Sequence, residues 1–419
     1  MALALKTITF NHDPFSASNS SLNIRRNKDF DVPVPEYDAA IPRTAAESCA
    51  AYAIQETAGQ AVFVRVELTE AAGANVQYEV RAVGGGLLGA LDPQLVDFSG
   101  GVTSRIVDFP LAHRNFTRIS RSTPGWGWEF RVMGTTTWQP LVRTAHRIYL
   151  VLKVPPAPWT QALADRRNPW TDLLDFSCDI AANLKTAADV AEALTKKVNK
   201  AYALRYDIRT GAPRYGFSTT GTSFRLTNWI DYVLKGGAPA NPVFCDTTPE
   251  QYPDFRIVNC YDCAASCALM AKVVGADSDY YFHQPFGYLN LVVPIGRGKC
   301  NNPFYGCVGF PVLGPDDAFR TAFANHAYQK LGGSRNYDAC LREWIPFFLK
   351  FLLLLIWLLI LILSFGTIND KRLLNRADGW LVDLSQPEYN ARTNDTSQPF
   401  EAAASGGTPA LQTLQFSVT

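Results

Sequence analysis

The sequence lacks any strong excess of charge, and it is poor in cysteine. Its 39 Lys and Arg residues nearly balance 38 Asp and Glu residues, which leaves a net charge of only +1. Because such a chain has no global positive field, we do not expect a nucleic-acid partner. Nine cysteines in 419 residues are too few, and odd in number, for a small secreted fold held together by disulfides. Some of the thiols are therefore expected to be free.

Two kinds of motif are also missing. The N-terminal residues have no basic segment followed by a sustained apolar stretch, so no cleavable signal peptide is expected. No glycine-rich phosphate loop follows a predicted strand, and Gly84, Gly85 and Gly86 are typical of a turn. We therefore predict that the protein uses no cofactor.

What is present is an ordinary globular composition. Hydrophobic residues make up 47% of the chain and charged residues 18%, which excludes wholesale disorder. The length predicts two or three folded units. Sequence patterns divide the chain into a polar extension (1–45), a β-sandwich (46–155), an α+β domain (156–344), an apolar segment (345–365) and a C-terminal tail (366–419).

The two predicted domains differ in the period of their apolar residues. Alternating runs at 61–68, 76–83, 128–132 and 146–152 predict the strands of an antiparallel sandwich. After a proline-rich connector at 155–158 the period is helical, over residues 186–201, 227–234 and 259–275. Strand-like segments follow at 280–282, 289–294, 319–331 and 336–340. This half is therefore predicted to be α+β, with the helices first and the sheet after them.

The apolar segment at 345–365 is long enough to predict a single transmembrane helix. About 21 residues at 1.5 Å per residue span roughly 31 Å, the thickness of a bilayer's hydrocarbon core. Lys350 lies near one end, where its ammonium group can extend to the lipid headgroups. No signal precedes the long N-terminal part, so we expect a single-pass membrane protein whose folded domain stays in the cytosol.

A possible nucleophile stands at the start of the helix predicted for 259–275. Cys260 lies in the first turn, where free backbone N–H groups and the helix dipole favour an anion. A thiol in such a place ionises more readily than a free cysteine. Cys260 is therefore the candidate for nucleophilic chemistry.

A base and an orienting acid are predicted on the strands that follow. His326 precedes Gly332 and Gly333, and Asp338 lies beyond them. If the chain turns at the glycine pair, His326 faces Asp338 or its neighbour Ala339 across an antiparallel ladder. The three residues then supply a thiolate, an imidazole that exchanges the proton, and a carboxylate that orients the imidazole.

This order of residues resembles the transglutaminase-like superfamily. The resemblance rests on Cys260-Tyr-Asp-Cys-Ala at the start of an apolar helix, and on Asn-His326-Ala-Tyr leading through a Gly-Gly hairpin to Tyr-Asp338-Ala. It covers roughly residues 155–341 and implies a papain-like α+β fold. By that resemblance Cys260 is the nucleophile, His326 the general base and acid, and Asp338 the orienting carboxylate, whereas Asp262 supports structure.

Several alternatives stay open at this point. Cys260-x2-Cys263 with Cys300-x6-Cys307 offers four thiolates, but the spacing is poor for zinc, and the second pair would form a disulfide in an oxidising compartment. Asp316 or Asp317 competes with Asp338 for the acidic role. His283 has no acidic residue at a useful spacing, so a structural role is favoured. The long interval between Cys260 and His326 is interpreted as an insertion.

The resulting prediction is a membrane-anchored cysteine hydrolase or acyltransferase that acts on protein or peptide substrates through a thioester. The alternative from another class is a membrane-anchored adaptor that keeps the fold for binding only. A third possibility is that the Leu-rich run interrupts a domain that folds without it, because residues 379–385 resemble core-forming sequence. The oligomeric state is not predicted.

Overall fold

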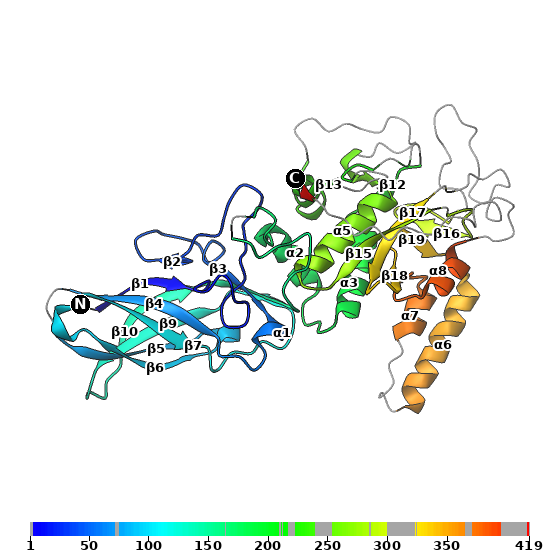
Figure 1. The fold of residues 1–419 in the computed structure, drawn as a ribbon. Helices are drawn as coiled ribbons and strands as arrows, with labels where there is room; N and C mark the ends of the chain where they lie inside the picture. Colours follow the sequence, from blue (N-terminus) through cyan, green and yellow to red (C-terminus); the bar gives the residue numbers. More distant parts are fainter. Residues whose placement is uncertain are drawn as a thin grey trace. The chain divides into compact units, whose positions relative to one another are not determined.

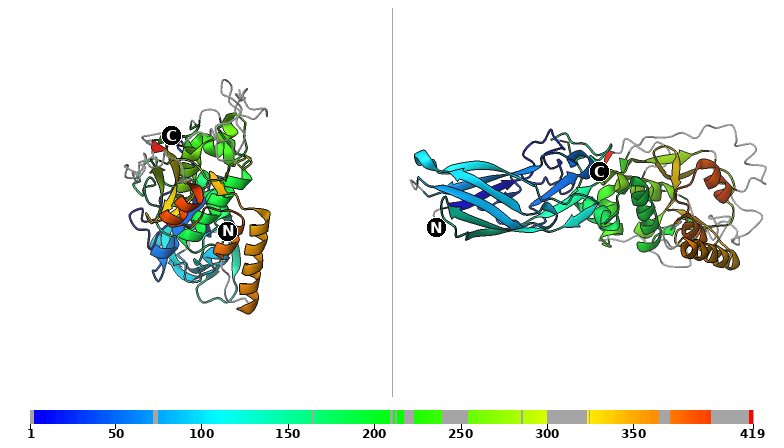
Figure 2. Two further views of the ribbon diagram at one scale, coloured as in Figure 1. Left: turned by 90° about the vertical axis from the view of Figure 1, so that its right-hand side faces the viewer. Right: turned by 90° about the horizontal axis from the view of Figure 1, so that it is seen from below.

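The computed structural model describes residues 3–71, 75–163, 165–208, 211, 213–216, 223–238, 254–284, 286–299, 323, 325–364, 371–394 and 417–418. The chain forms two compact units. Unit 1 consists of Met1–Thr186 with Val273–Ala276, and unit 2 of Ala187–Lys272 with Asp277–Thr419. Figures 1 and 2 show a first unit made mostly of strands and a second in which helices surround a smaller sheet.

Unit 1 contains two antiparallel sheets and a smaller mixed sheet. The first sheet has the order β2-β1-β4-β7, with β1 Leu3–Thr9, β2 Tyr37–Asp38, β4 Phe63–Glu70 and β7 Ser104–Pro110. The second has the order β10-β9-β5-β6, with β5 Gln77–Gly84, β6 Leu91–Asp97, β9 Gly125–Val132 and β10 Gln139–Ala145. In the third, β11 (Arg147–Val151) pairs in parallel with β3 (Cys49–Ala53) and antiparallel with β8 (Ser120–Ser122). The helices are α1 Ile54–Thr57 and α2 Thr171–Ile180, with 3₁₀ turns at Gly86–Leu88 and Ser99–Gly101.

The alternating sequence of these strands explains their burial. In β4 every second side chain is buried, because successive residues of a strand point to opposite faces. The buried residues of both four-stranded sheets form a single apolar cluster that includes Trp126 and Trp128. Leu3, Leu5 and Ile8 belong to the same cluster, so the start of the chain is a sheet strand and not the expected polar extension.

Unit 2 is built on the antiparallel sheet β15-β17-β18, with β15 Ser278–His283, β17 His326–Leu331 and β18 Arg335–Tyr337. Two-stranded pairs join β12 (Arg205–Tyr206) to β14 (Ile257–Val258), β16 (Val292–Pro294) to β19 (Leu341–Glu343), and β13 (Ser223–Phe224) to β20 (Ser417–Val418). The helices are α3 Ala187–Ala201, α4 Leu226–Asn228, α5 Cys260–Val273, α6 Phe347–Leu363, α7 Lys371–Ala377 and α8 Gln386–Thr393, with a π-helical turn at Trp229–Leu234 and a 3₁₀ turn at Asp254–Arg256.

Gln329 of β17 connects the sheet to two helices. Its Nε2 donates to the Cys267 carbonyl of α5 at 3.4 Å, and its Oε1 accepts from Thr195 of α3 at 3.3 Å. Helix α5 is buried along its whole length, which agrees with a sequence that is apolar on nearly every side. The sheet therefore holds α5, and with it Cys260, in a fixed position relative to β17.

The predicted transmembrane helix is wrong. Helix α6 has 17 residues between Pro346 and Ser364, and at 1.5 Å per residue this is about 26 Å, shorter than a hydrocarbon core of about 30 Å. Among the residues that the structure describes, no helix combines the length and the apolar character needed to cross a bilayer. The expected single-pass membrane localisation, with its cytosolic orientation, is corrected accordingly. Lys350 does not extend to headgroups but forms an ion pair with Asp378 at 2.9 Å.

Helix α6 is nevertheless unusual for its exposure. Twelve of its large apolar side chains have exposed fractions between 36% and 85%, and only Leu353 is buried. Figures 1 and 2 show the orange ribbon of α6 extending away from the sheet of unit 2, with α7 beside part of its length.

The chain leaves the sheet before α6 and returns to the same place after α7. The Glu343 backbone N–H donates to the Gly379 carbonyl at 2.8 Å, and Arg342 forms an antiparallel bridge with Trp380. Gly379 has φ +74°, and a Cβ atom there would collide with the Glu343 carbonyl oxygen, so only glycine fits this close approach. Trp380, Leu381, Val382 and Leu384 are buried, as the core-forming character of residues 379–385 predicts.

Candidate active site

Cys260 occupies the first turn of α5 because the residue before it caps the helix. Asn259 Oδ1 accepts hydrogen bonds from the backbone N–H groups of Tyr261 at 3.0 Å and Asp262 at 3.2 Å. In return, Asp262 Oδ2 accepts from the Asn259 N–H at 3.2 Å. This reciprocal arrangement is a capping box. It fixes the helix start at Cys260, whose thiol is buried at the positive end of the helix dipole.

Asp262 also holds the loop that precedes α4. Its carboxylate accepts from the backbone N–H groups of Arg214, Tyr215 and Gly216 at 2.8 to 3.1 Å. Burial raises the pKa of Asp262 to about 6, and the backbone N–H donors oppose this rise. The expected structural role of Asp262 agrees with these contacts.

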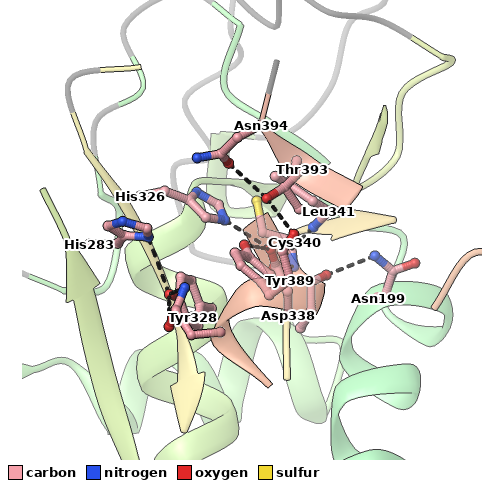
Figure 3. Close-up of polar contacts among 12 residues, drawn as sticks. Asn199, His283, His326, Tyr328, Asp338, Cys340, Leu341, Tyr389, Thr393 and Asn394 are labelled. Atoms are coloured by element: carbon pink, nitrogen blue, oxygen red, sulfur yellow. Dashed lines mark hydrogen bonds and ion pairs between the residues drawn. The ribbon is translucent and has the colours of Figure 1, made fainter. Parts of the chain in front are cut away.

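His326 and Asp338 are joined directly. His326 Nε2 lies 2.9 Å from Asp338 Oδ2, and both side chains are completely buried. Figure 3 shows the imidazole directed toward the carboxylate, with its other edge directed away from it. The carboxylate thus fixes the orientation of the ring.

The register that brings them together differs from the predicted one. Gln329 pairs with Tyr337 and Leu331 with Arg335, so Asp338 is not opposite His326 in the ladder. Strand β18 ends at Tyr337, and Asp338 begins a turn in which its Oδ1 accepts from the N–H groups of Cys340 at 2.7 Å and Leu341 at 3.0 Å. This turn directs the other carboxylate oxygen toward His326.

The acid–base pair favours a protonated imidazole. Burial alone would lower the pKa of His326. Its charge interactions and hydrogen bonds with Asp338 and Cys260 outweigh the effect of burial and raise this pKa to about 10. His326 Nδ1 is buried without a fully formed hydrogen bond to any described residue, and Cys260 is the thiol close enough to influence it. This environment favours the imidazolium form of His326.

Aromatic side chains enclose the imidazole. The ring centroids of Phe286, Phe323 and Tyr328 lie 4.9, 6.0 and 6.0 Å from that of His326. Such surroundings exclude water and strengthen the interaction between the charged groups inside. Cys260 itself is also buried.

His283, for which the sequence favoured a structural role, lies beside this site. It pairs directly with His326 across β15 and β17, and its Nδ1 lies 3.2 Å from the Tyr328 hydroxyl. Burial, together with the charges of His326 and Lys330, lowers the pKa of His283 to about 4. Its spacing from acidic residues gave no signal, because its partners are an aromatic hydroxyl and a second histidine.

The cysteine alternatives are tested only in part. Cys263 and Cys340 are buried free thiols, and no group of three or more potential ligands among the described residues could hold a metal ion. Cys300 and Cys307, like Asp316 and Asp317, lie outside the residues that the structure describes. Within the described part, the acidic partner of His326 is Asp338.

Comparison of the sequence with protein-family models and with curated proteins gives no match.

Proposed function

We propose that the protein is a cysteine-dependent hydrolase or acyltransferase that acts on amide bonds of proteins or peptides. The observation that carries the proposal is the buried pair of His326 and Asp338, 2.9 Å apart, next to a thiol at a helix N-terminus. The resemblance of the motifs around Cys260, His326 and Asp338 to the transglutaminase-like superfamily supports the same chemistry.

The reaction uses the charge state of this site in two stages. The Cys260 thiolate attacks the substrate carbonyl carbon, and the imidazolium of His326 gives its proton to the leaving amine as the C–N bond breaks. The product is a thioester. His326, now neutral, takes a proton from water or an acceptor amine, which attacks the thioester and regenerates the thiolate. The Cys260 backbone N–H is a candidate donor to the oxyanion.

Alkylation by iodoacetamide tests whether Cys260 is activated. At pH 7 we expect Cys260 to react at least about tenfold faster in the unmodified chain than in His326→Ala, because the imidazolium no longer stabilises the thiolate. Peptide mapping compares Cys260 with Cys267, a buried thiol on the same helix. His113→Ala, which changes an exposed histidine of unit 1, is the matched control. Equal rates in all three chains would contradict the proposal.

Acyl transfer separates an enzyme from a binding protein. Incubation with p-nitrophenyl acetate should add one acetyl group to Cys260, detectable by intact mass, followed by its loss to water or to an added amine. The Cys260→Ala variant should not be acetylated at this position. An adaptor that only binds would show no acetylation of Cys260 above that of Cys267.

A further inference from the structure

The carboxylate of Asp338 has a second side-chain partner, which follows α6 and α7 in the sequence. The Tyr389 hydroxyl, on α8, donates to Asp338 Oδ2 at 2.8 Å, and the tyrosine is fully buried. This is the same oxygen that His326 Nε2 contacts at 2.9 Å. Figure 3 shows Tyr389 and His326 converging on one carboxylate.

The two oxygens of Asp338 are therefore fully occupied. Oδ1 accepts from two backbone N–H groups of its own turn, and Oδ2 is shared between an imidazole and a phenol. A carboxylate with four donors cannot rotate without losing several hydrogen bonds, each of which is strong because the acceptor is charged. Three of the four donors belong to strand β17 or to the turn that begins at Asp338. Tyr389 is the one that comes from another part of the chain.

Packing holds the phenol in place independently of this hydrogen bond. The rings of Tyr389 and Tyr328 lie 4.3 Å apart, and α8 begins with a capping box between Ser385 and Glu388. Burial and the neighbouring Asp338 carboxylate raise the pKa of Tyr389 well above its ordinary value, so the hydroxyl keeps its proton and acts as a donor at neutral pH.

We propose that Tyr389 is a positioning residue of the active site, which sets the orientation of Asp338 and, by sharing Oδ2, limits how strongly that carboxylate holds the proton on His326. The inference rests on the proposed function of Cys260, His326 and Asp338. It extends the site to the segment that follows α6 and α7.

The Tyr389→Phe variant tests this role, because it removes one hydroxyl and keeps the ring. A hydrogen bond to a charged acceptor corresponds to about 1 to 2 pH units. The rate of Cys260 alkylation should change at the alkaline pH at which His326 loses its proton. We expect this pH, the alkaline limb of the rate profile, to rise by this amount, since Asp338 then interacts more strongly with the imidazolium. At pH 7 the rate should fall about threefold to tenfold, because the pair is less well oriented. No shift and no loss of rate would overturn the inference.

Tyr337→Phe is the matched control. It removes the hydroxyl of another buried tyrosine of unit 2, and that hydroxyl donates to Asp383 and not to Asp338. A merely structural effect of losing a buried hydroxyl would appear in both variants. If Tyr389 acts through Asp338, its change should also have no further effect on the pH profile in an Asp338→Ala background.

Fluorotyrosine at position 389 provides a second measurement that keeps the hydroxyl. Its more acidic O–H is a stronger hydrogen-bond donor to Asp338, so the alkaline limb of Cys260 alkylation should move to lower pH. An unchanged profile would overturn the inference even if Tyr389→Phe failed to fold. The unmodified chain and His326→Ala are measured alongside: equal alkylation of these two would refute the proposed function, whereas a difference between them without an effect at Tyr389 would refute only the positioning role.

Discussion

His283 lies directly opposite His326 across the ladder of β15 and β17, which places two imidazoles with very different proton affinities side by side. His326 is protonated at neutral pH because its pKa is raised to about 10, and His283 is neutral because its pKa is lowered to about 4. Protonation of both rings at once would put two cations in a buried space. The site therefore has a defined charge state between these two values.

This relationship predicts a loss of stability in acid. A histidine whose folded-state pKa is lowered takes up protons more readily when unfolded, so the free energy of unfolding falls as the pH decreases from about 6.5 to about 4. His283→Gln should reduce this dependence by on the order of 2 to 3 kcal/mol, measured by urea denaturation across the range. His113→Gln, at an exposed position, serves as the control. Identical curves for His283→Gln and the unmodified chain would contradict the prediction.

The opposite dependence is expected on the alkaline side. The raised pKa of His326 adds stability that is complete below its unfolded value of about 6.5 and is lost as the pH rises toward about 10. Asp338→Asn should flatten this decline, because the neutral amide no longer stabilises the imidazolium. It should also slow Cys260 alkylation at pH 7 by about tenfold or more.

Asp383→Asn is the control for this experiment, since Asp383 pairs with Arg335 at a partly exposed position. Its variant should keep both the alkaline decline of stability and the rate of alkylation. A decline of unchanged slope in Asp338→Asn would show that another group titrates there.

The carboxylate of Asp262 is predicted to be structural. An amide in Asp262→Asn keeps one acceptor oxygen and directs an N–H₂ group at backbone donors, so we expect the free energy of unfolding to fall by about 2 to 3 kcal/mol. The measurement is urea denaturation at pH 7. Asp231→Asn, which changes an acidic residue paired with Lys235 at the surface, should cost less than about 0.5 kcal/mol. Equal effects of the two changes would contradict the assigned role.

Removal of α6 and α7 tests whether the sheet closes without them. Because the Glu343 N–H and the Gly379 carbonyl are 2.8 Å apart, a turn of about four Gly and Asn residues can replace 344–378. We expect a folded chain with unchanged Cys260 alkylation and weaker binding of an apolar dye, because twelve exposed large side chains are gone. The buried contacts of Asn375 and Ala377 are lost with α7, so the melting temperature should fall by several degrees.

A chain that fails to fold would show that α6 and α7 are needed for the sheet. Replacing 346–363 alone by a helix of the same length with Glu and Lys at the exposed positions is the companion variant. It keeps α7 and should reduce dye binding to the same extent.

Local patterns predicted the parts of the site that depend on neighbouring residues. The apolar run after Asn259 indicated the helix that begins at Cys260, and the glycine pair indicated the hairpin between β17 and β18. The exact register was wrong because the turn occupies three residues, 332–334, between Leu331 and Arg335. The contact between His326 and Asp338 depends on a bend after Tyr337 that no periodicity shows.

Features that depend on distant parts of the chain could not be predicted in this way. Hydropathy alone does not distinguish a long apolar run that spans a bilayer from the 17-residue α6, which ends at Leu363. Tyr389 lies in a short, mostly polar helix, and its importance follows only from the return of the chain to the sheet at Gly379. The strand at Leu3–Thr9 was missed because polar residues soon after it dominated the pattern.

The contact between Tyr389 and Asp338 also has a consequence for biosynthesis. A ribosome makes Cys260 first, then His326 and Asp338, and only later the helix that supplies the last donor to the carboxylate. Until α8 has emerged from the exit tunnel and docked, the acid is incompletely held. Under the proposed function, the Cys260 thiol of the nascent polypeptide therefore acquires its full reactivity only after α8 has docked.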